Sequence, residues 1–393
     1  MNQNSDLACV DFDQNPFVVI WEATRSCALK CVHCRAEAMD SRNPGELTTK
    51  QAFLLLDEIR RFGNPLVVLT GGDPLRRSDA KEIVGYGTSI GLRVAMTPSG
   101  TDEVTFNDLK ELKSRGLARL AVSLDGSNAP FHDSFRGVKG SFDWTMNIIR
   151  WAEEAELPIQ INTTISKHNI EDLDELCFLL ESLKIVLWSV FFLVPTGRGK
   201  LENEIGGYEY ERVFERMAHL SEHVSFDIKS TEAPHYRRVL IQKAVREQLP
   251  SFAKREPPVR AARSRQESAP RVLSDVVRAP MGVNDAKGFV FISHTGEIYP
   301  SGFLPVSAGN VKKNSLVDVY RNSILFTRLR DYSNLKGKCG ACEYKAICGG
   351  SRARAFAVYG DMMAPEPFCV HVPKGYEISN EEMKFWEMEN LKS

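Results

Sequence analysis

The 393-residue sequence lacks both a long hydrophobic run and an excess of charge of one sign. No apolar run reaches the roughly 20 residues that a membrane-spanning helix needs, so we expect no membrane segment. The formal net charge is -1, which gives no overall attraction to nucleic acid. The first residues, MNQNSDLACVDFD, have neither the basic start nor the apolar stretch of a secretory signal, so we expect a cytoplasmic protein.

Cysteine is the residue with an unusual distribution. The chain has nine cysteines, and disulfides are rare in the cytoplasm. Cys177 lies in an apolar stretch of helical spacing and is expected in the core, and Cys9 lies in the N-terminal tail. The other seven form two clusters: Cys27, Cys31 and Cys34, and then Cys339, Cys342, Cys348 and Cys369.

Between Phe17 and Val194, apolar β-branched runs alternate with segments of helical periodicity. Six strand–helix units in series predict a parallel sheet with right-handed crossovers. They are too few for a closed eight-unit barrel, so the expected fold class is α/β, a partial (β/α)6 TIM-type barrel. The predicted strands are 17–22, 66–70, 92–96, 120–124, 159–165 and 187–194, and 48–62 and 142–155 are two of the predicted helices.

The C-terminal third is expected to form a small α+β domain. Residues 246–278 are rich in Arg and Pro without periodicity, which indicates a linker or a lid. A β-hairpin is predicted at 288–301, a helix at 315–329 and a charged C-terminal helix at 380–390. The predicted boundaries are 1–16 for a tail, 17–235 for the partial barrel, 236–280 for the linker or lid, 281–375 for the second domain, and 376–393 for the C-terminal helix.

Cys27, Cys31 and Cys34 follow the first predicted strand with the spacing C-x3-C-x2-C. This position is the C-terminal mouth of the barrel, where α/β enzymes hold their active sites. Structural zinc sites usually take four ligands, and His33 lies awkwardly between two of the cysteines. Three thiolates on a cubane iron–sulfur cluster would leave one iron free to bind another molecule. A zinc or redox site is the alternative for this cluster taken alone.

The C-x3-C-x2-C loop resembles the signature of the radical S-adenosylmethionine (SAM) enzymes. The resemblance implies that Cys27, Cys31 and Cys34 hold a [4Fe-4S] cluster and form the reactive centre. It implies that SAM is cleaved to methionine and a 5′-deoxyadenosyl radical, which abstracts hydrogen from a small-molecule or peptide substrate. It further implies a reductant such as a ferredoxin or flavodoxin.

Further motifs extend the resemblance. T-G-G-D-P-L, after the second strand, is similar to the family's G-G-E-P loop; Asp73 stands where Glu is usual, so we expect a backbone oxygen to bind SAM more than the carboxylate does. S-L-D-G and H-D-S-F-R-G follow the fourth strand, and L-V-P-T-G ends the sixth. The resemblance assigns the methionine amino group, carboxylate, ribose and adenine of SAM to contacts with Gly71, Gly72, Asp73, Pro74, Ser123, Arg136, Asn162, Thr163 and Val194.

The second cysteine cluster has the spacing C-x2-C-x5-C-x20-C. Four thiolates can hold zinc or a fully ligated iron–sulfur cluster. The segment resembles the SPASM or twitch extension of radical SAM enzymes, which carries auxiliary clusters. Ser301 stands at a cysteine position of the full pattern, and the residues after Cys348 contain no further thiol until Cys369. We therefore expect one auxiliary [4Fe-4S] cluster, ligated by Cys339, Cys342, Cys348 and Cys369, with a role in electron transfer.

Several segments, among them W-E-A-T-R-S-C, F-R-G-V-K-G, A-P-H-Y-R-R and C-G-G-S-R-A-R-A, resemble the branch that contains the alternative heme synthase and the heme d1 enzymes. The resemblance implies a tetrapyrrole substrate and propionate decarboxylation. His235, Tyr236, Arg237 and Arg238 would then supply axial or propionate contacts, or else simply begin a helix with solvated arginines.

Two alternatives remain open. One is a maturase of ribosomally made peptides, a class close to the same branch; about sixteen residues precede the first strand, too few for the precursor-binding domain that such enzymes often carry. The other is a non-catalytic iron–sulfur electron carrier, which would have no need of the SAM motifs. Ser301 and Ser351 replace cysteines that we associate with the heme-forming members.

Overall fold

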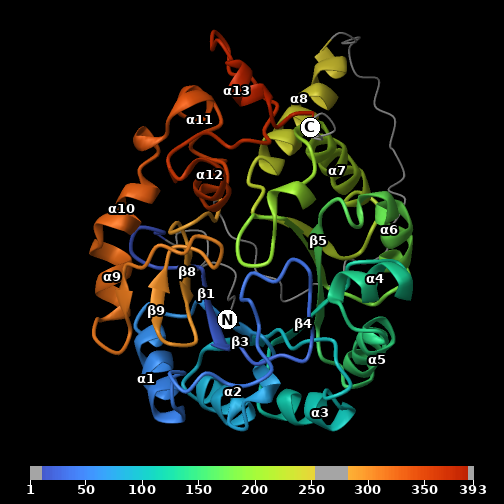
Figure 1. Ribbon diagram of the computed structural model, residues 1–393, viewed down its shortest axis with the longest axis vertical. Helices are drawn as coiled ribbons and strands as arrows, with labels where there is room; N and C mark the ends of the chain where they lie inside the picture. Colours follow the sequence, from blue (N-terminus) through green and yellow to red (C-terminus); the bar gives the residue numbers. More distant parts are fainter. Residues whose placement is uncertain (1–10, 253–281, 388–393) are drawn as a thin grey trace, which may run out of the picture.

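The computed structural model describes residues 11–252 and 282–387. Its centre is a curved ten-stranded sheet in the order β10-β9-β8-β1-β2-β3-β4-β5-β6-β7 (Figure 1). From β1 to β7, each strand pairs in parallel with the next, which confirms the partial barrel. These strands are β1 (Val18–Thr24), β2 (Leu66–Gly71), β3 (Arg93–Met96), β4 (Arg119–Ser123), β5 (Ile159–Ile165), β6 (Leu187–Phe192) and β7 (Asp227–Thr231).

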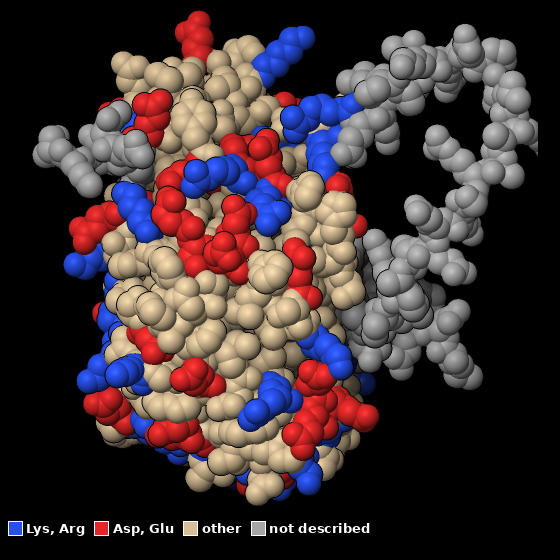
Figure 2. Space-filling model, turned by 90° about the vertical axis from the view of Figure 1, so that its right-hand side faces the viewer, with Lys and Arg blue, Asp and Glu red and all other residues tan. Residues whose placement is uncertain are grey.

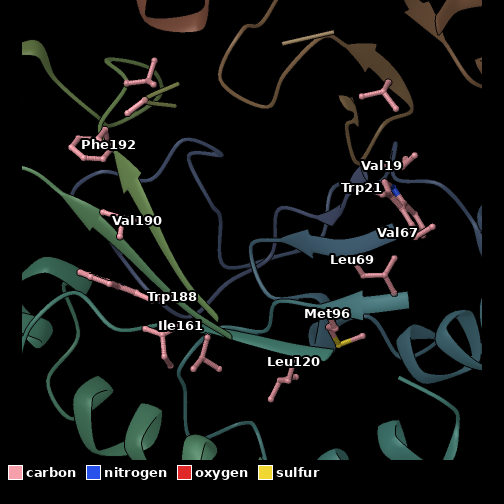
Figure 3. Packing of buried hydrophobic residues seen from close by; sticks show 14 of the residues in the cluster. Val19, Trp21, Val67, Leu69, Met96, Leu120, Ile161, Trp188, Val190 and Phe192 are labelled. Carbon is pink, nitrogen blue, oxygen red and sulfur yellow. The ribbon is translucent and has the colours of Figure 1, made fainter. Parts of the chain in front are cut away.

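Helices cover the convex face of the barrel sheet (Figure 1). Alternate side chains of a strand point to opposite faces, and the apolar set that includes Trp21, Leu69 and Trp188 packs on the helical side (Figure 3). The other set faces the barrel interior and carries the polar residues of the candidate site. The helices are α1 (Thr49–Arg60), α2 (Ala80–Ser89), α3 (Phe106–Ser114), α4 (Ala129–Arg136), α5 (Ser141–Glu154), α6 (Leu173–Glu181) and α7 (Gly207–Leu220).

The seventh parallel strand, β7, is absent from the predicted elements. Its sequence DIKST has a single large apolar residue, and its residues are half-buried or exposed. It lies at the edge of the sheet, so it needs no continuous apolar run. An edge strand of this kind gives no hydrophobic signal in the sequence.

The predicted hairpin exists, but it continues the barrel sheet. Strand β8 (Phe289–Ile292) pairs in parallel with β1 and antiparallel with β9 (Glu297–Tyr299). The short β10 (Gly309–Asn310) completes this edge. The boundary expected at residue 281 therefore does not divide the sheet.

The remaining helices differ from the predictions in detail. Residues expected to begin a linker form α8 (Tyr236–Phe252), and most of the Arg/Pro-rich segment lies outside the described residues. The single helix predicted at 315–329 is two helices, because Ser323 caps the second of them. Of the helix predicted at 380–390, the structure describes residues up to 387, and within these it is helical over Asn380–Met383. These elements are α9 (Leu316–Asn322), α10 (Ile324–Arg330), α11 (Gly337–Ala341), α12 (Arg352–Tyr359) and α13 (Asn380–Met383), with 3₁₀ turns at Pro74–Arg76, Ile170–Asp172, Leu201–Asn203 and Tyr332–Asn334.

On the face shown in Figure 2, basic and acidic side chains are interspersed. This mixture agrees with the nearly neutral net charge of -1. In the part of the chain that the structure describes, no helix is both long enough and apolar enough to cross a bilayer.

Candidate active site and second cysteine cavity

A cavity of about 210 Å³ opens at the C-terminal ends of the barrel strands. Cys27, Cys31 and Cys34 all line it. Cys27 and Cys31 are buried, and Cys34 is half-buried. The cavity therefore lies where the sequence predicts the active site, with three thiols in one wall.

Residues of three loops hold the cysteine loop in place through its backbone. After β2, the Gly72 N–H donates to the Thr24 carbonyl at 2.8 Å. At the end of α4, the Arg136 carbonyl accepts a hydrogen bond from the Lys30 N–H at 3.1 Å, and after β6 the Arg198 N–H donates to the Cys34 carbonyl at 3.0 Å. The cysteine loop itself has almost no regular secondary structure, so these contacts fix its shape.

Glycine is required at two of these contacts. A Cβ on Gly72 would lie 2.3 Å from the Ser26 carbonyl oxygen, and a Cβ on Gly197 would lie 2.4 Å from that of Arg35. Gly197 also has φ of +59°, a conformation that glycine adopts without strain. Gly72 of the T-G-G-D-P loop thus packs against the cysteine loop. This contact explains why the residue is a glycine, independently of any ligand.

The environment of the thiols fits a group that binds them as thiolates. Burial raises the pKa of Cys27 to about 11 and also raises the pKa of Cys31. The Arg136 guanidinium, 3.6 Å from the Cys31 Sγ, opposes this shift. Buried thiols are inert until a metal displaces their protons. Three thiols lining one cavity therefore suit a metal cluster better than a free nucleophile.

The structure brings six of the nine expected SAM contacts to this cavity: Gly71, Gly72, Ser123, Arg136, Asn162 and Val194. Asp73 and Pro74 are buried and do not line the cavity. The Asp73 Oδ1 accepts a hydrogen bond from the Leu75 N–H at 3.0 Å, and its Oδ2 has no partner among the described residues. Burial raises the pKa of Asp73 to about 7. The backbone at Gly71 and Gly72 thus faces the cavity in place of the Asp73 carboxylate.

Thr163 does not face the cavity, so the contact with the ribose that the sequence predicts for it is wrong. Asn162 and Thr163 are adjacent in β5, and their side chains point to opposite faces. The Thr163 hydroxyl donates to the Leu124 carbonyl at 2.7 Å and accepts from the Trp188 Nε1 at 2.9 Å. Its neighbour Thr164 lines the cavity instead.

Arg136 lines the cavity with its charge already paired. Its guanidinium forms an ion pair with Asp125, a residue of the S-L-D-G motif that is fully buried. The Asp125 N–H in turn donates to the His132 Nδ1 at 3.1 Å. The Nε of Arg136 has no partner among the described residues. One donor thus remains for an anionic group, while Asp125 fixes the orientation of the guanidinium.

Sequence reasoning missed one side of the cavity. Residues 97–100, which follow β3, line it, and the Ser99 Oγ lies 3.1 Å from the Cys27 Sγ. Phe191 and Phe303 line it as well, with their ring centroids 6.4 Å apart. T-P-S-G is a recognisable loop signal after a predicted strand, whereas Phe303 reaches the cavity only because β8 joins the barrel sheet.

A second cavity is lined by all four C-terminal cysteines, Cys339, Cys342, Cys348 and Cys369. Three backbone N–H groups donate to their sulfurs: Glu366 to Cys339 at 3.2 Å, Tyr344 to Cys342 at 3.4 Å, and Gly350 to Cys348 at 3.4 Å. Burial raises the pKa of Cys369 to about 12. This donor set fits a four-thiolate metal group, and the N–H donors favour sulfurs that carry negative charge.

Ser301 and Ser351, the serines expected at cysteine positions of the longer pattern, share one partner. The Ser301 hydroxyl donates to the Glu232 Oε1 at 3.1 Å, and the Ser351 hydroxyl donates to its Oε2 at 2.6 Å. Asp285 lies beside them and accepts the N–H groups of Arg352 and Ala353. Burial and the neighbouring Asp285 carboxylate raise the pKa of Glu232. A hydrogen-bonded carboxyl network therefore occupies the position between Ser301 and Ser351.

The segment A-P-H-Y-R-R lies at the second cavity. His235 and Arg238 line that cavity, whereas Tyr236 is buried. The Arg237 guanidinium donates to the carbonyls of Val283 and Ile347. None of these four residues lines the first cavity, so the structure does not support their expected contact with a substrate there.

Arg354 connects the two cavities. It is fully buried, and its Nε donates to the carbonyl of Leu193, which lines the first cavity, at 3.1 Å. Its Nη1 lies 3.2 Å from the carboxylate of Glu366, which lines the second cavity. This residue of the C-G-G-S-R-A-R-A segment thus binds the end of β6 to the wall of the second cavity.

Comparison with known proteins agrees with this geometry. A family model described as the radical SAM superfamily matches residues 21–180. The AdoMet-dependent heme synthase of Methanosarcina barkeri (strain Fusaro / DSM 804) is 39% identical over 358 residues, which cover 91% of this chain and 97% of the relative. The PqqA peptide cyclase of Rhodopseudomonas palustris (strain ATCC BAA-98 / CGA009) is 25% identical over 367 residues, which cover 91% of this chain and 88% of the relative.

Among solved structures, Streptococcus suis SuiB bound to S-adenosylmethionine has a TM-score of 0.67 and 16% identity, covering 91% of this chain and 78% of that chain. At this level of identity the likeness shows the fold. The identity to the heme synthase over nearly the full length of both chains shows the family. This chain therefore belongs to the radical SAM superfamily and is an enzyme.

Proposed function

We propose that this enzyme removes carboxyl groups from the propionate side chains of a tetrapyrrole, with SAM as the source of the radical. The observation that carries the proposal is the 39% identity to an AdoMet-dependent heme synthase across 97% of that relative. The peptide cyclase is only 25% identical over a similar length, so a peptide substrate is the second candidate.

The cavity walls support this proposal. Phe191 and Phe303 provide an aromatic surface beside the three cysteines, which suits a flat apolar macrocycle. Arg35 lines the same cavity, and its guanidinium lies 4.6 Å from the centroid of the Phe291 ring. This guanidinium is already paired with the buried Glu22 carboxylate at 2.7 Å, so the cavity wall offers the macrocycle its aromatic surface and not a free cation.

The residues of the first cavity would hold a [4Fe-4S] cluster and SAM, and those of the second cavity an auxiliary [4Fe-4S] cluster. When bound, these groups supply one electron for the cleavage of SAM and an acceptor for the electron that a decarboxylating substrate radical gives up. Cys27, Cys31 and Cys34 would ligate the first cluster. Ser123, Arg136 and Asn162 would orient SAM, and Val194 would contact the adenine.

We propose a single auxiliary cluster, ligated by Cys339, Cys342, Cys348 and Cys369. The Glu232 carboxyl, bound by Ser301 and Ser351, fills the place that further cysteines would share in the longer pattern. The eight cysteines of the described residues are all free, which leaves their thiols available as ligands, and the reductant we propose is a ferredoxin or flavodoxin of the reducing cytoplasm.

The test is an anaerobic reaction of the reconstituted enzyme with SAM, a reductant and iron-coproporphyrin III, analysed by mass spectrometry. We expect the porphyrin to lose carbon dioxide and hydrogen from its propionates, with one 5′-deoxyadenosine formed for each decarboxylation. If 5′-deoxyadenosine forms while the porphyrin stays unchanged, the tetrapyrrole proposal is wrong. The same assay with precursor peptides encoded near the gene would then test the peptide candidate.

A further inference from the structure

His235 is a buried polar residue for which the described part of the chain provides no hydrogen-bond partner. It immediately precedes α8, is 1% exposed, and lines the cavity of the four C-terminal cysteines. Neither its Nδ1 nor its Nε2 has a hydrogen-bond partner among the described residues. A buried donor left without an acceptor destabilises the folded state. We therefore expect its partner to be a group that the cavity binds.

Rings from α7 fix the imidazole in position. Tyr210 stacks on it with centroids 5.3 Å apart, and Phe214 packs edge-on at 4.8 Å. Burial and the cations of Arg238, Arg354 and Lys338 keep the pKa of His235 well below its ordinary value. A neutral imidazole carries one N–H donor. The sulfurs of an iron–sulfur cluster are acceptors, so cluster and imidazole are complementary.

The rest of the cavity wall also favours negative charge. Its basic residues are Lys338, Lys345 and Arg238, the last of which is paired with Glu211, and the acidic residue Glu366 is paired with Arg354. Three backbone N–H groups donate to the sulfurs of Cys339, Cys342 and Cys348. Hydrogen bonds to the sulfurs and nearby cations stabilise the reduced form of a cluster and raise its reduction potential.

We propose that the ring N–H of His235 donates a hydrogen bond to a sulfur of the auxiliary cluster and raises the reduction potential of that cluster. The inference rests on the proposed function, in which the second cavity holds an iron–sulfur cluster that accepts an electron. It gives His235 a role in tuning that cluster and none in binding the substrate.

The test is a redox titration followed by electron paramagnetic resonance, without substrate. The parent is the full chain carrying Cys27→Ala, Cys31→Ala and Cys34→Ala, so that the auxiliary cluster gives the only signal. We expect His235→Phe to lower the midpoint potential by about 59 mV, which is a tenfold change in a one-electron equilibrium. His235→Asn, which keeps an N–H donor, should recover part of the shift. His219→Phe, on the exposed surface of α7, should leave the potential unchanged.

An unchanged potential in His235→Phe, with the iron retained, would overturn the proposal. If His235→Phe loses its iron, pulsed resonance of the reduced parent labelled with ¹⁵N-histidine decides instead, with His371→Gln added because His371 lines the same cavity. A weak histidine nitrogen coupling is expected; no coupling, or the strong coupling of a direct iron ligand, would overturn the inference. Failure of the porphyrin assay alone would reject the substrate and leave this result standing. A parent chain without iron would reject the auxiliary cluster itself.

Discussion

Individual residues of the same type have different environments in this molecule. Cys31 and Cys177 are both buried thiols, but Cys31 lines the first cavity and Cys177 packs in the core from α6. We predict that Cys31→Ala abolishes SAM cleavage, so that no 5′-deoxyadenosine forms, and leaves the auxiliary iron in place. Anaerobic product analysis and iron content measure both effects. Cys177→Ala is the matched control, and native activity in Cys31→Ala would refute the assignment.

The neighbours Asn162 and Thr163 allow a second test at this scale. Asn162 lines the cavity, whereas the Thr163 hydroxyl bonds to Leu124 and Trp188 on the other face of the sheet. We predict that Asn162→Ala weakens SAM binding about tenfold, or about 1.4 kcal/mol, with little change in stability. Thr163→Val should leave SAM binding unchanged and lower the free energy of unfolding by about 1 kcal/mol. Calorimetric titration with SAM and thermal unfolding separate the two effects; equal losses of SAM affinity would contradict the geometry.

Among the structural elements, the loops determine the shape of the candidate site through close backbone contacts. Gly197 has φ of +59°, and a Cβ there would lie 2.4 Å from the Arg35 carbonyl. We predict that Gly197→Ala displaces the loop after Cys34 and reduces the iron of the first cluster by half or more. Gly360 is the matched control, since it has φ of +69° and an added methyl group would meet nothing within 4 Å among the described residues. If Gly360→Ala causes the same loss, strain of the backbone and not the contact is responsible.

The elements also show what the sequence could and could not reveal. The six apolar strands and the spacing of Cys27, Cys31 and Cys34 were predictable, because buried parallel strands and clustered thiols leave clear local signals. Strand β7 was not, because its residues are largely polar. The orientation expected for Thr163 was wrong because the motif was interpreted without the alternation of side chains between the two faces of a strand. The contact of A-P-H-Y-R-R with the second cavity depends on tertiary packing, which no local sequence pattern predicts.

At the scale of the whole molecule, the carboxyl network of Glu232 couples stability to pH. Burial and Asp285 raise the pKa of Glu232 above its ordinary value of 4.5. The folded state then binds a proton that the unfolded state releases, so stability should fall over the pH interval that begins at about 4.5 and ends at the raised pKa. We predict that Glu232→Gln, which cannot titrate, makes the melting temperature less dependent on pH over this interval. Anaerobic thermal unfolding at several pH values measures the slope.

The exposed Glu181 of α6 supplies the control for that measurement. Glu181→Gln should keep the slope of the parent protein, because its carboxylate faces solvent. A slope in Glu232→Gln equal to that of the parent would show that Glu232 does not retain a proton in the folded state. The N–H groups of Arg352 and Ala353, which donate to Asp285, are unaffected by this substitution and should hold that carboxylate in both variants.

The pairing of β1 with β8 has a consequence for how the protein is made. Val18 lies beside Phe289 in the sheet, so one edge of β1 stays unpaired until the ribosome has synthesised most of the chain. The strand that leads into the cysteine loop is therefore completed late. Insertion of iron and sulfur at Cys27, Cys31 and Cys34 should accordingly follow translation, on a chain whose exposed strand edge needs protection from aggregation until then.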